Sequence, residues 1–545
     1  MKPSRLASQR GVVALMAVLF LLFMLGVVLV IAHQMAATDV HDSSSQNLSV
    51  EALFLAESGL ETGGYRYRNG TACVSPGFDL VQPLGSVTFA LTAATFAPPA
   101  TTLSANLGAA SGVVPVASTA GFAPHGRIQI AGEEVDYAGL SANAADCAGA
   151  APCFTGAVRG VVGSPTPATH LSGTAVGQNQ CLIRSVGATN IARRTLEAAT
   201  TVKNVQSGSI TMNPSTRTVA LTAVDPRRSF VICHNRTNDG DPDQRVTCVL
   251  TNATTLTITS SQNSAADVVQ WHVVEFTSGI AVQRGLATIP QNQPGAAPFI
   301  LNVTLPTAVD LTKSFVLISE RIATGSEDRD ERRTIRARLS STTNLELSRL
   351  EEGTSDVFVA WQVIEIEDAT VQSGLTTLAN GSTSVTATIG AVDVTRTFLV
   401  FSRRAGNVGG REERYQVRGE LTNATTLTFT RAGNNTAVDI AWFAVTLNDG
   451  TTVQRGTVTA AAGTATGNAA LAPAVVLNRS FPIISVSGSS NGDDDRLDDT
   501  ALTGTLTSPP NLQLQRVSTT RSATAAWFVV DLGSPRIDWK EIIPP

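Results

Sequence analysis

The feature that most constrains this chain is a unit that occurs four times after residue 204. Each copy opens with the motif V-Q-x-G, continues to a phenylalanine that follows serine or threonine, and closes on a tryptophan. The phenylalanines are spaced by 83 to 85 residues, at Phe230, Phe315, Phe398 and Phe481, and the tryptophans are Trp271, Trp361, Trp442 and Trp527. A fixed period of this kind indicates tandem modules rather than one large domain.

Each copy contains short runs in which apolar and polar residues alternate, such as residues 255–259. Runs of this kind, separated by turns rich in threonine, asparagine and glycine, predict an antiparallel β-sandwich of about six strands. We therefore expect β-sandwich repeats at 204–276, 277–366, 367–447 and 448–533, followed by a tail at 534–545.

The N-terminus carries a second strong signal. Basic residues Lys2, Arg5 and Arg10 precede residues 12–31, a run of 20 apolar or glycine residues without charge. About 20 helical residues at about 1.5 Å each match the thickness of a bilayer hydrocarbon core, about 30 Å. The positive flank places the N-terminus in the cytoplasm. The sequence thus predicts a transmembrane and filament helix at 12–64, which spans the bilayer with residues 12–31 and continues past the membrane. It also predicts a single-pass inner-membrane protein whose bulk is periplasmic or extracellular.

The same segment resembles a known family. S-Q-R-G at 8–11, V-V-A-L at 12–15 and A-E-S-G-L-E at 56–61 are similar to PilX-type minor pilins and to the large minor pseudopilin of type II secretion. The resemblance implies a prepilin-type leader at 1–11, which a prepilin peptidase cuts between Gly11 and Val12, and a helix that packs against other pilin-like subunits. Most major pilins carry glutamate at the fifth mature position, where this chain has Met16, and this departure favours a tip or initiation position.

Pilin-like proteins place a small antiparallel sheet after the helix, and the resemblance assigns residues 65–203 to it. Residues 85–91 alternate like a strand, and residues 181–187 and 192–198 resemble the closing strands of minor pilins. The residues between them, 93–178, are expected to form a β insertion.

Six cysteines suit an oxidising compartment, and without a C-x-x-C motif they do not favour a zinc site. About fifteen connectivities are possible for six cysteines. Pairing within each proposed module favours Cys147–Cys153, Cys233–Cys248 and Cys73–Cys181.

Two candidate binding sites lie in the repeats. Carboxylates cluster in loops at Asp239, Asp241, Asp243, Asp493, Asp494 and Asp495. Such clusters can bind calcium, but arginines follow both, so a salt-bridged hairpin tip remains the alternative. The V-Q-x-G motif and the tryptophan strand also look similar to the H-type lectin sandwich, which binds galactosamine-type sugars. That resemblance implies that Trp271 and His272 could stack on and hydrogen-bond a sugar.

Composition and motifs exclude other classes of function. A net charge of −5 argues against a nucleic-acid partner. The sequence has no G-x-S-x-G or P-loop motif in a βα context and no H-E-x-x-H motif, so we do not expect an enzyme. We expect a mainly β, α+β minor pilin-like subunit that displays its repeats to a surface glycan or protein. The alternative is an inner-membrane-anchored, carbohydrate-binding surface protein without a filament role.

Overall fold

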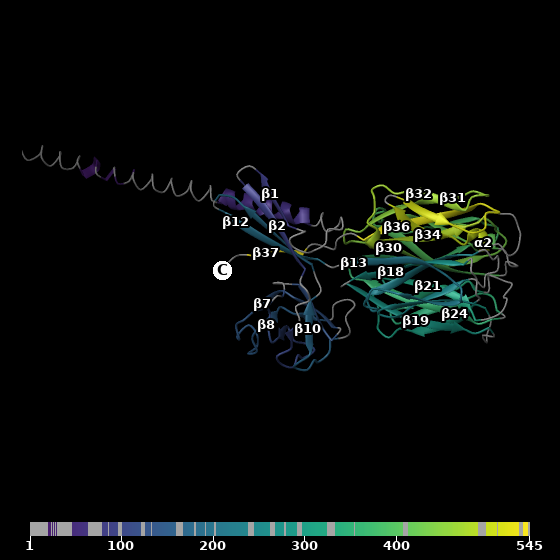
Figure 1. The fold of residues 1–545 in the computed structure, drawn as a ribbon, viewed down its shortest axis with the longest axis horizontal. Coiled ribbons are helices and arrows are strands. Elements are labelled where there is room, and N and C mark those ends of the chain that lie inside the picture. Colours follow the sequence, from purple (N-terminus) through teal and green to yellow (C-terminus); the bar gives the residue numbers. More distant parts are fainter. Residues whose placement is uncertain are drawn as a thin grey trace, which may run out of the picture.

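The fold is mainly β, with 57% of the structure in strands and 9% in helices. The computed structural model describes residues 20–22, 24–25, 27, 29, 46–63, 79–84, 87–95, 101–120, 122, 126–131, 133–159, 167–178, 181–190, 192–200, 203–237, 245–261, 267–276, 279–291, 297–323, 333–353, 355–406, 412–488, 497–508, 511–532 and 538–542. Three bodies follow one another along it: a helix on a sheet, a small β module and the four repeats (Figure 1).

The first body is a helix over residues 46–63 that packs on a five-stranded antiparallel sheet (Figure 1). The strand order is β1 (Leu80–Leu84), β2 (Val87–Thr95), β11 (Cys181–Ala188), β12 (Arg193–Thr200) and β37 (Asp538–Ile542). The helix buries Ala52 and Ala56. A Cβ on Gly187 of β11 would lie 2.0 Å from the carbonyl oxygen of Ala52, so helix and sheet meet at a distance that only glycine permits.

The prediction of a long N-terminal transmembrane helix, and with it the single-pass inner-membrane location, is wrong. Within the described ranges, no helix is long and apolar enough to span a bilayer. Of the apolar run, only residues 20–22, 24–25, 27 and 29 are described. The helix over 46–63 carries Glu51, Glu57 and Glu61, and its apolar face is covered by the sheet. Its periodicity therefore reflects packing on the sheet.

A small β module leaves the sheet between two neighbouring strands. Because β2 pairs directly with β11, for example Ala90 with Val186, the residues between them fold as a separate body. One of its sheets contains β3 (Thr101–Thr102), β10 (Ala175–Gln178), β5 (Gly126–Ile130), β6 (Glu133–Tyr137) and β9 (Val158–Arg159), and the other contains β4 (Val113–Pro115), β8 (Cys153–Thr155) and β7 (Gly139–Ser141).

A buried ionic cluster stabilises this module. The carboxylate of Glu133, 1% exposed, accepts hydrogen bonds from Arg159 Nε at 2.6 Å and lies 2.7 Å from His170 Nε2. Burial raises the pKa of Glu133, but the contacts with Arg159 and His170 outweigh burial and lower the pKa below its ordinary value. The carboxylate therefore stays ionised and paired inside the module.

Each repeat consists of two three-stranded antiparallel sheets, as the alternating pattern indicates. In repeat 1 the sheets are β13-β18-β15 and β14-β17-β16, and the same arrangement recurs in the other three. The strands of repeats 1 and 2 are β13 (Lys203–Thr211), β14 (Thr216–Ala220), β15 (Ser229–Arg236), β16 (Val246–Asn252), β17 (Thr255–Ser260), β18 (Val268–Phe276), β19 (Ile280–Ile289), β20 (Phe299–Thr304), β21 (Ser314–Ile322), β22 (Arg336–Ser341), β23 (Asn344–Arg349) and β24 (Val357–Ile366). Those of repeats 3 and 4 are β25 (Ala369–Leu378), β26 (Ser384–Thr388), β27 (Thr397–Ala405), β28 (Arg418–Asn423), β29 (Thr426–Thr430), β30 (Val438–Leu447), β31 (Thr452–Ala460), β32 (Thr466–Ala470), β33 (Ser480–Ser487), β34 (Thr503–Ser508), β35 (Asn511–Gln515) and β36 (Ala523–Asp531). Short helical turns η3 (Glu412–Arg414), η4 (Leu477–Arg479) and α2 (Leu497–Thr500) lie between strands.

The four repeats close into a ring. Between repeats 1 and 4, Thr505 Oγ1 lies 3.3 Å from Gln270 Oε1, and Arg236 donates to Gln515. One shared core contains buried apolar residues of all four repeats, including the phenylalanine of each, while repeats 1 and 4 also have cores of their own. Residues far apart in the sequence thus pack as one body, which lies to the right in Figure 1.

The C-terminal end returns to the first sheet. Residues 534–545, expected to form a tail, include β37, which pairs with β12 through contacts such as Lys540 opposite Glu197. The ring therefore occupies the connection between two adjacent strands of the sheet that holds the helix (Figure 1).

Candidate functional site

The V-Q-x-G motif is structural in all four repeats. An added Cβ on its glycine would lie 2.4 to 2.8 Å from a ring carbon of the repeat's tryptophan. Its glutamine forms hydrogen bonds with the backbone of a loop that connects the two sheets. Gln206, for example, donates to the carbonyl of Thr222 and accepts from the N–H of Thr222, both at 2.9 Å. The glycines are Gly208, Gly285, Gly374 and Gly456. The motif therefore fixes sandwich geometry rather than contacting a ligand.

Trp271 and His272, the expected sugar-binding pair, lie inside the ring. Their exposed fractions are 8% and 2%, and Trp271 belongs to the core of repeat 1. Burial, and then the neighbouring His234, lower the pKa of His272 to about 3. Neither side chain faces solvent, where a sugar would stack.

The acidic loop residues proposed for calcium lie outside the described residues, namely Asp239, Asp241, Asp243, Asp493, Asp494 and Asp495. Nearby, Asp499 is 2% exposed and accepts a hydrogen bond from Ser518 Oγ at 2.8 Å. In the part of the chain that the structure describes, no group of three or more His, Cys, Asp or Glu side chains is placed to hold a metal ion.

Two of the three expected disulfides are present, Cys147–Cys153 in the small β module and Cys233–Cys248 in repeat 1. The third pairing involves Cys73, which is not among the described residues, and Cys181, whose backbone lies in β11. The cleavage residues Gly11 and Val12 also fall outside the described ranges.

A cavity of about 340 Å³ lies where the equivalent strands β15, β21, β27 and β33 meet, and residues of all four repeats line it. The four phenylalanines precede the first lining residues of these strands. Phe230 packs against Phe315 and Phe481, with ring centroids 6.3 and 5.8 Å apart, and Phe315 packs against Phe398 at 5.8 Å. These edge-to-face contacts link the phenylalanines of the four repeats to one another.

The cavity changes from apolar to charged along the strands. Two residues after each phenylalanine the lining is apolar, with Ile232, Leu317, Val400 and Ile483. Five residues after it the lining contains Glu320 and Arg403, and Arg245 of repeat 1 joins them. The cavity thus has an apolar end and a charged end.

Among the described residues, the charged end contains the guanidinium groups of Arg245 and Arg403 and the carboxylate of Glu320. Arg245 donates to Glu320, and Arg403 donates to Tyr415 O and Gln416 Oε1, both at 2.6 Å. Both guanidinium groups lie over the Tyr415 ring, 6.0 and 5.6 Å from its centroid. Burial raises the pKa of Glu320 against the opposing effect of the two arginines.

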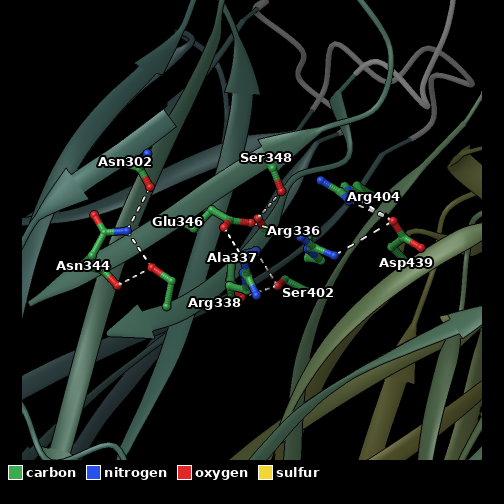
Figure 2. A network of polar contacts seen from close by, with 11 residues as sticks. Asn302, Arg336, Ala337, Arg338, Asn344, Glu346, Ser348, Ser402, Arg404 and Asp439 are labelled. Carbon is green, nitrogen blue, oxygen red and sulfur yellow. Dashed lines mark hydrogen bonds and ion pairs between the residues drawn. The ribbon is translucent and has the colours of Figure 1, made fainter. Parts of the chain in front are cut away.

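Three of the four seams between repeats use the same hydrogen bond. The serine four residues after the phenylalanine accepts from a backbone N–H of the preceding repeat: Ser319 from Cys248 at 3.0 Å, Ser402 from Ala337 at 2.8 Å and Ser485 from Gly419 at 3.0 Å. Figure 2 shows the seam between repeats 2 and 3, where Ser402 meets Ala337 beside the ion pair of Arg404 with Asp439.

The seam that closes the ring differs from the other three. In repeat 1 the position of the seam serine holds His234, which lies opposite Gln270 on β18, while the other repeats have alanine opposite the serine. His234 Nδ1 is buried without a hydrogen-bond partner among the described residues. Burial lowers the pKa of His234 to about 4.

Sequence reasoning missed the cavity residues, because they come from different repeats and differ in type. The signal that could have found them is their fixed offset from the repeat phenylalanine. Comparison of the chain with protein-family models gives no match, and comparison with curated proteins gives none either.

Proposed function

We propose that this chain is a minor pilin-like structural subunit of a type IV pilus or related secretion filament, at a tip or initiation position, which displays a closed ring of β-sandwich repeats for adhesion or interaction. The observation that carries the proposal is the helix over 46–63 packed on an antiparallel sheet, with the small β module and the ring both placed in connections between neighbouring strands. Such an arrangement suits a carrier domain that presents other domains.

Exposed apolar side chains near the N-terminus support packing against other subunits. Phe20, Leu21 and Leu29 are in helical conformation and are 66%, 69% and 63% exposed. Apolar side chains gathered in this way mark surfaces that a partner covers. Similar helices of neighbouring filament subunits would supply that cover.

The buried positions of Trp271 and His272 favour this proposal over the carbohydrate-binding alternative. Because a buried indole cannot stack on a sugar without rearrangement of its repeat, the ring is better suited to packing and display.

N-terminal sequencing of the mature protein, isolated from cells that contain a prepilin peptidase, tests the proposal. We expect the mature chain to begin at Val12 and the Gly11→Leu variant to keep its leader. Ser8→Ala, in the leader but away from the junction, serves as the control and should be processed normally. A mature chain that still begins at Met1, or normal processing of Gly11→Leu, would contradict the proposal.

A further inference from the structure

We propose that the ring opens at the seam between repeats 4 and 1 while each repeat stays folded. This inference goes beyond the filament role, because it depends only on contacts within the ring and on its two connections. Three seams join repeats that are consecutive in the chain; only residues 367 and 368, for example, separate β24 from β25. The fourth seam joins the last repeat to the first, so no peptide connection crosses it.

A backbone hydrogen bond is present at each of the three consecutive seams. The valine of the V-Q-x-G motif donates its N–H to the carbonyl three residues before the phenylalanine of the preceding repeat: Val282 to Arg227 at 2.8 Å, Val371 to Thr312 at 2.6 Å and Val453 to Thr395 at 2.7 Å. The equivalent residues at the closing seam, Val205 and Asn478, are both described, and no backbone hydrogen bond joins them. The closing seam therefore lacks a directional contact that the other three share.

The closing seam also lacks the seam serine. At the other seams this serine accepts from a backbone N–H of the preceding repeat. The equivalent residues at the closing seam are His234 and Gly504, and Nδ1 of His234 is buried without a hydrogen-bond partner among the described residues. Opening would admit water to this atom, whereas closure leaves it unsatisfied. The closed state thus carries a cost at the position of the seam serine, and opening removes it.

The contacts that do cross the closing seam are compatible with opening and reclosing. They include Phe230 packed edge-to-face on Phe481, Arg236 donating to Gln515, and Thr505 Oγ1 at 3.3 Å from Gln270 Oε1. Apolar packing is non-directional, so it tolerates a displacement that would break a hydrogen bond. The strands that lead into repeat 1 and out of repeat 4, β12 and β37, pair with each other in the first sheet. This pairing keeps the two repeats close, so the seam can close again.

Opening at this seam would give the cavity a side entrance. His234 on β15 and Leu502, just before β34, both line the cavity, and β15 contacts β34 at the closing seam. The cavity lining on the two sides of this seam includes apolar residues, Ile232 of repeat 1 and Ile483 of repeat 4. The open state would therefore widen access to an apolar part of the ring interior.

Double electron–electron resonance between nitroxide labels on the full chain tests the proposal. Ser209→Cys with Thr457→Cys places one label in each repeat beside the closing seam, and Leu286→Cys with Leu375→Cys uses the equivalent positions of repeats 2 and 3. All four residues directly follow the motif glycine and are exposed. The chain without introduced cysteines is the labelling blank. We expect a second, longer distance for the closing-seam pair and a single distance for the matched pair.

The His234→Ser variant links the longer distance to the seam. Because it places a hydroxyl where the other seams have one, it should lower the fraction of the longer distance in the closing-seam pair at least threefold. A single distance in both pairs, or a longer distance populated equally in both, would overturn the proposal. A longer distance whose fraction His234→Ser leaves unchanged would overturn it as well.

Discussion

At the position four residues after the repeat phenylalanine, repeat 1 has His234 where the other three repeats have serine. The other three repeats place a small, hydrogen-bonded serine at this position, and only the closing seam holds a titratable ring there. In the folded chain its pKa is about 4, against an ordinary value of 6.5. Between these values the unfolded chain binds more protons than the folded chain. Stability is therefore present above about pH 6.5 and is lost as the pH falls towards 4.

The His234→Ser variant should make the ring less sensitive to acid. When the pKa of a histidine is lower in the folded chain than in the unfolded chain, acidification between the two pKa values removes up to about 1.4 kcal/mol of stability per pH unit. The free energy of unfolding, measured with urea at pH 7 and pH 4.5, should fall less in the variant than in the unchanged chain. Ser402→Ala, which removes a seam hydrogen bond without a titratable group, should lower stability equally at both values. An equal loss on acidification in His234→Ser and the unchanged chain would contradict the expectation.

Gly374 shows the steric role of the V-Q-x-G motif. An added Cβ would lie 2.4 Å from Trp442 Cζ2, which is well inside van der Waals contact. We expect Gly374→Ala to destabilise the ring by about 1–3 kcal/mol, the usual cost of overpacking a core. Urea unfolding monitored by tryptophan fluorescence measures this change. Gly177→Ala, where no neighbouring atom lies within 4 Å, is the control. Equal effects of the two substitutions would refute the steric explanation.

At the level of elements, the contact between the helix over 46–63 and β11 holds the first body together. Gly187 and Gly59 allow the helix to approach the sheet, since a Cβ at Gly59 would lie 2.0 Å from Ser185 Oγ. The helix contributes its buried face to this contact and leaves glutamates on the other side. The same amphipathic pattern explains why this segment is a sheet-packing helix.

Gly187→Ala should loosen the helix without unfolding the ring. Its Cβ would collide with the backbone of Ala52 and Ala56, and backbone cannot yield as a flexible side chain can. Amide hydrogen exchange over residues 46–63 should become at least tenfold faster, while exchange in β24 stays the same. Gly112→Ala, whose nearest contact is 4.0 Å away, should leave both unchanged. Unaltered protection of the helix in Gly187→Ala would show that the close approach is not required.

At the level of the whole molecule, closure makes the four repeats depend on one another. Buried apolar residues of all four repeats share one core, and edge-to-face contacts link the phenylalanines of all four repeats within it. Removing one repeat would expose the apolar faces of its two neighbours. The ring is therefore expected to unfold as one cooperative unit, in contrast to an open array of tandem modules.

Phe315→Ala should destabilise the entire ring. Truncation of a buried phenylalanine costs about 3–5 kcal/mol, and Phe315 contacts the phenylalanines of two other repeats. Scanning calorimetry should show a single ring transition that moves to lower temperature as a whole. Phe358→Ala, at a partly exposed ring under Arg321, is the control and should have a smaller effect. Separate transitions for individual repeats would contradict a shared core.

The sequence by itself determined the local units. Alternation and turn chemistry act between near neighbours, so they indicated two sheets per repeat, the insertion before residues 181–187, and disulfides within modules. The apolar run at 12–31 led to a wrong prediction of one long transmembrane helix: within the described residues no helix is long and apolar enough to span a bilayer, and the helix over 46–63 is covered by a sheet.

Only the tertiary structure decided how these units meet. Ring closure depends on the angle at every seam, and contacts such as Gln270 with Thr505 join residues that no local pattern relates. Closure of the ring creates the cavity and buries Trp271 and His272. The chain then leaves the ring, and β37 pairs with β12 of the first sheet. All of these features depend on contacts between residues far apart in the sequence. The alternating pattern within one repeat does not indicate which residues of another repeat it will contact.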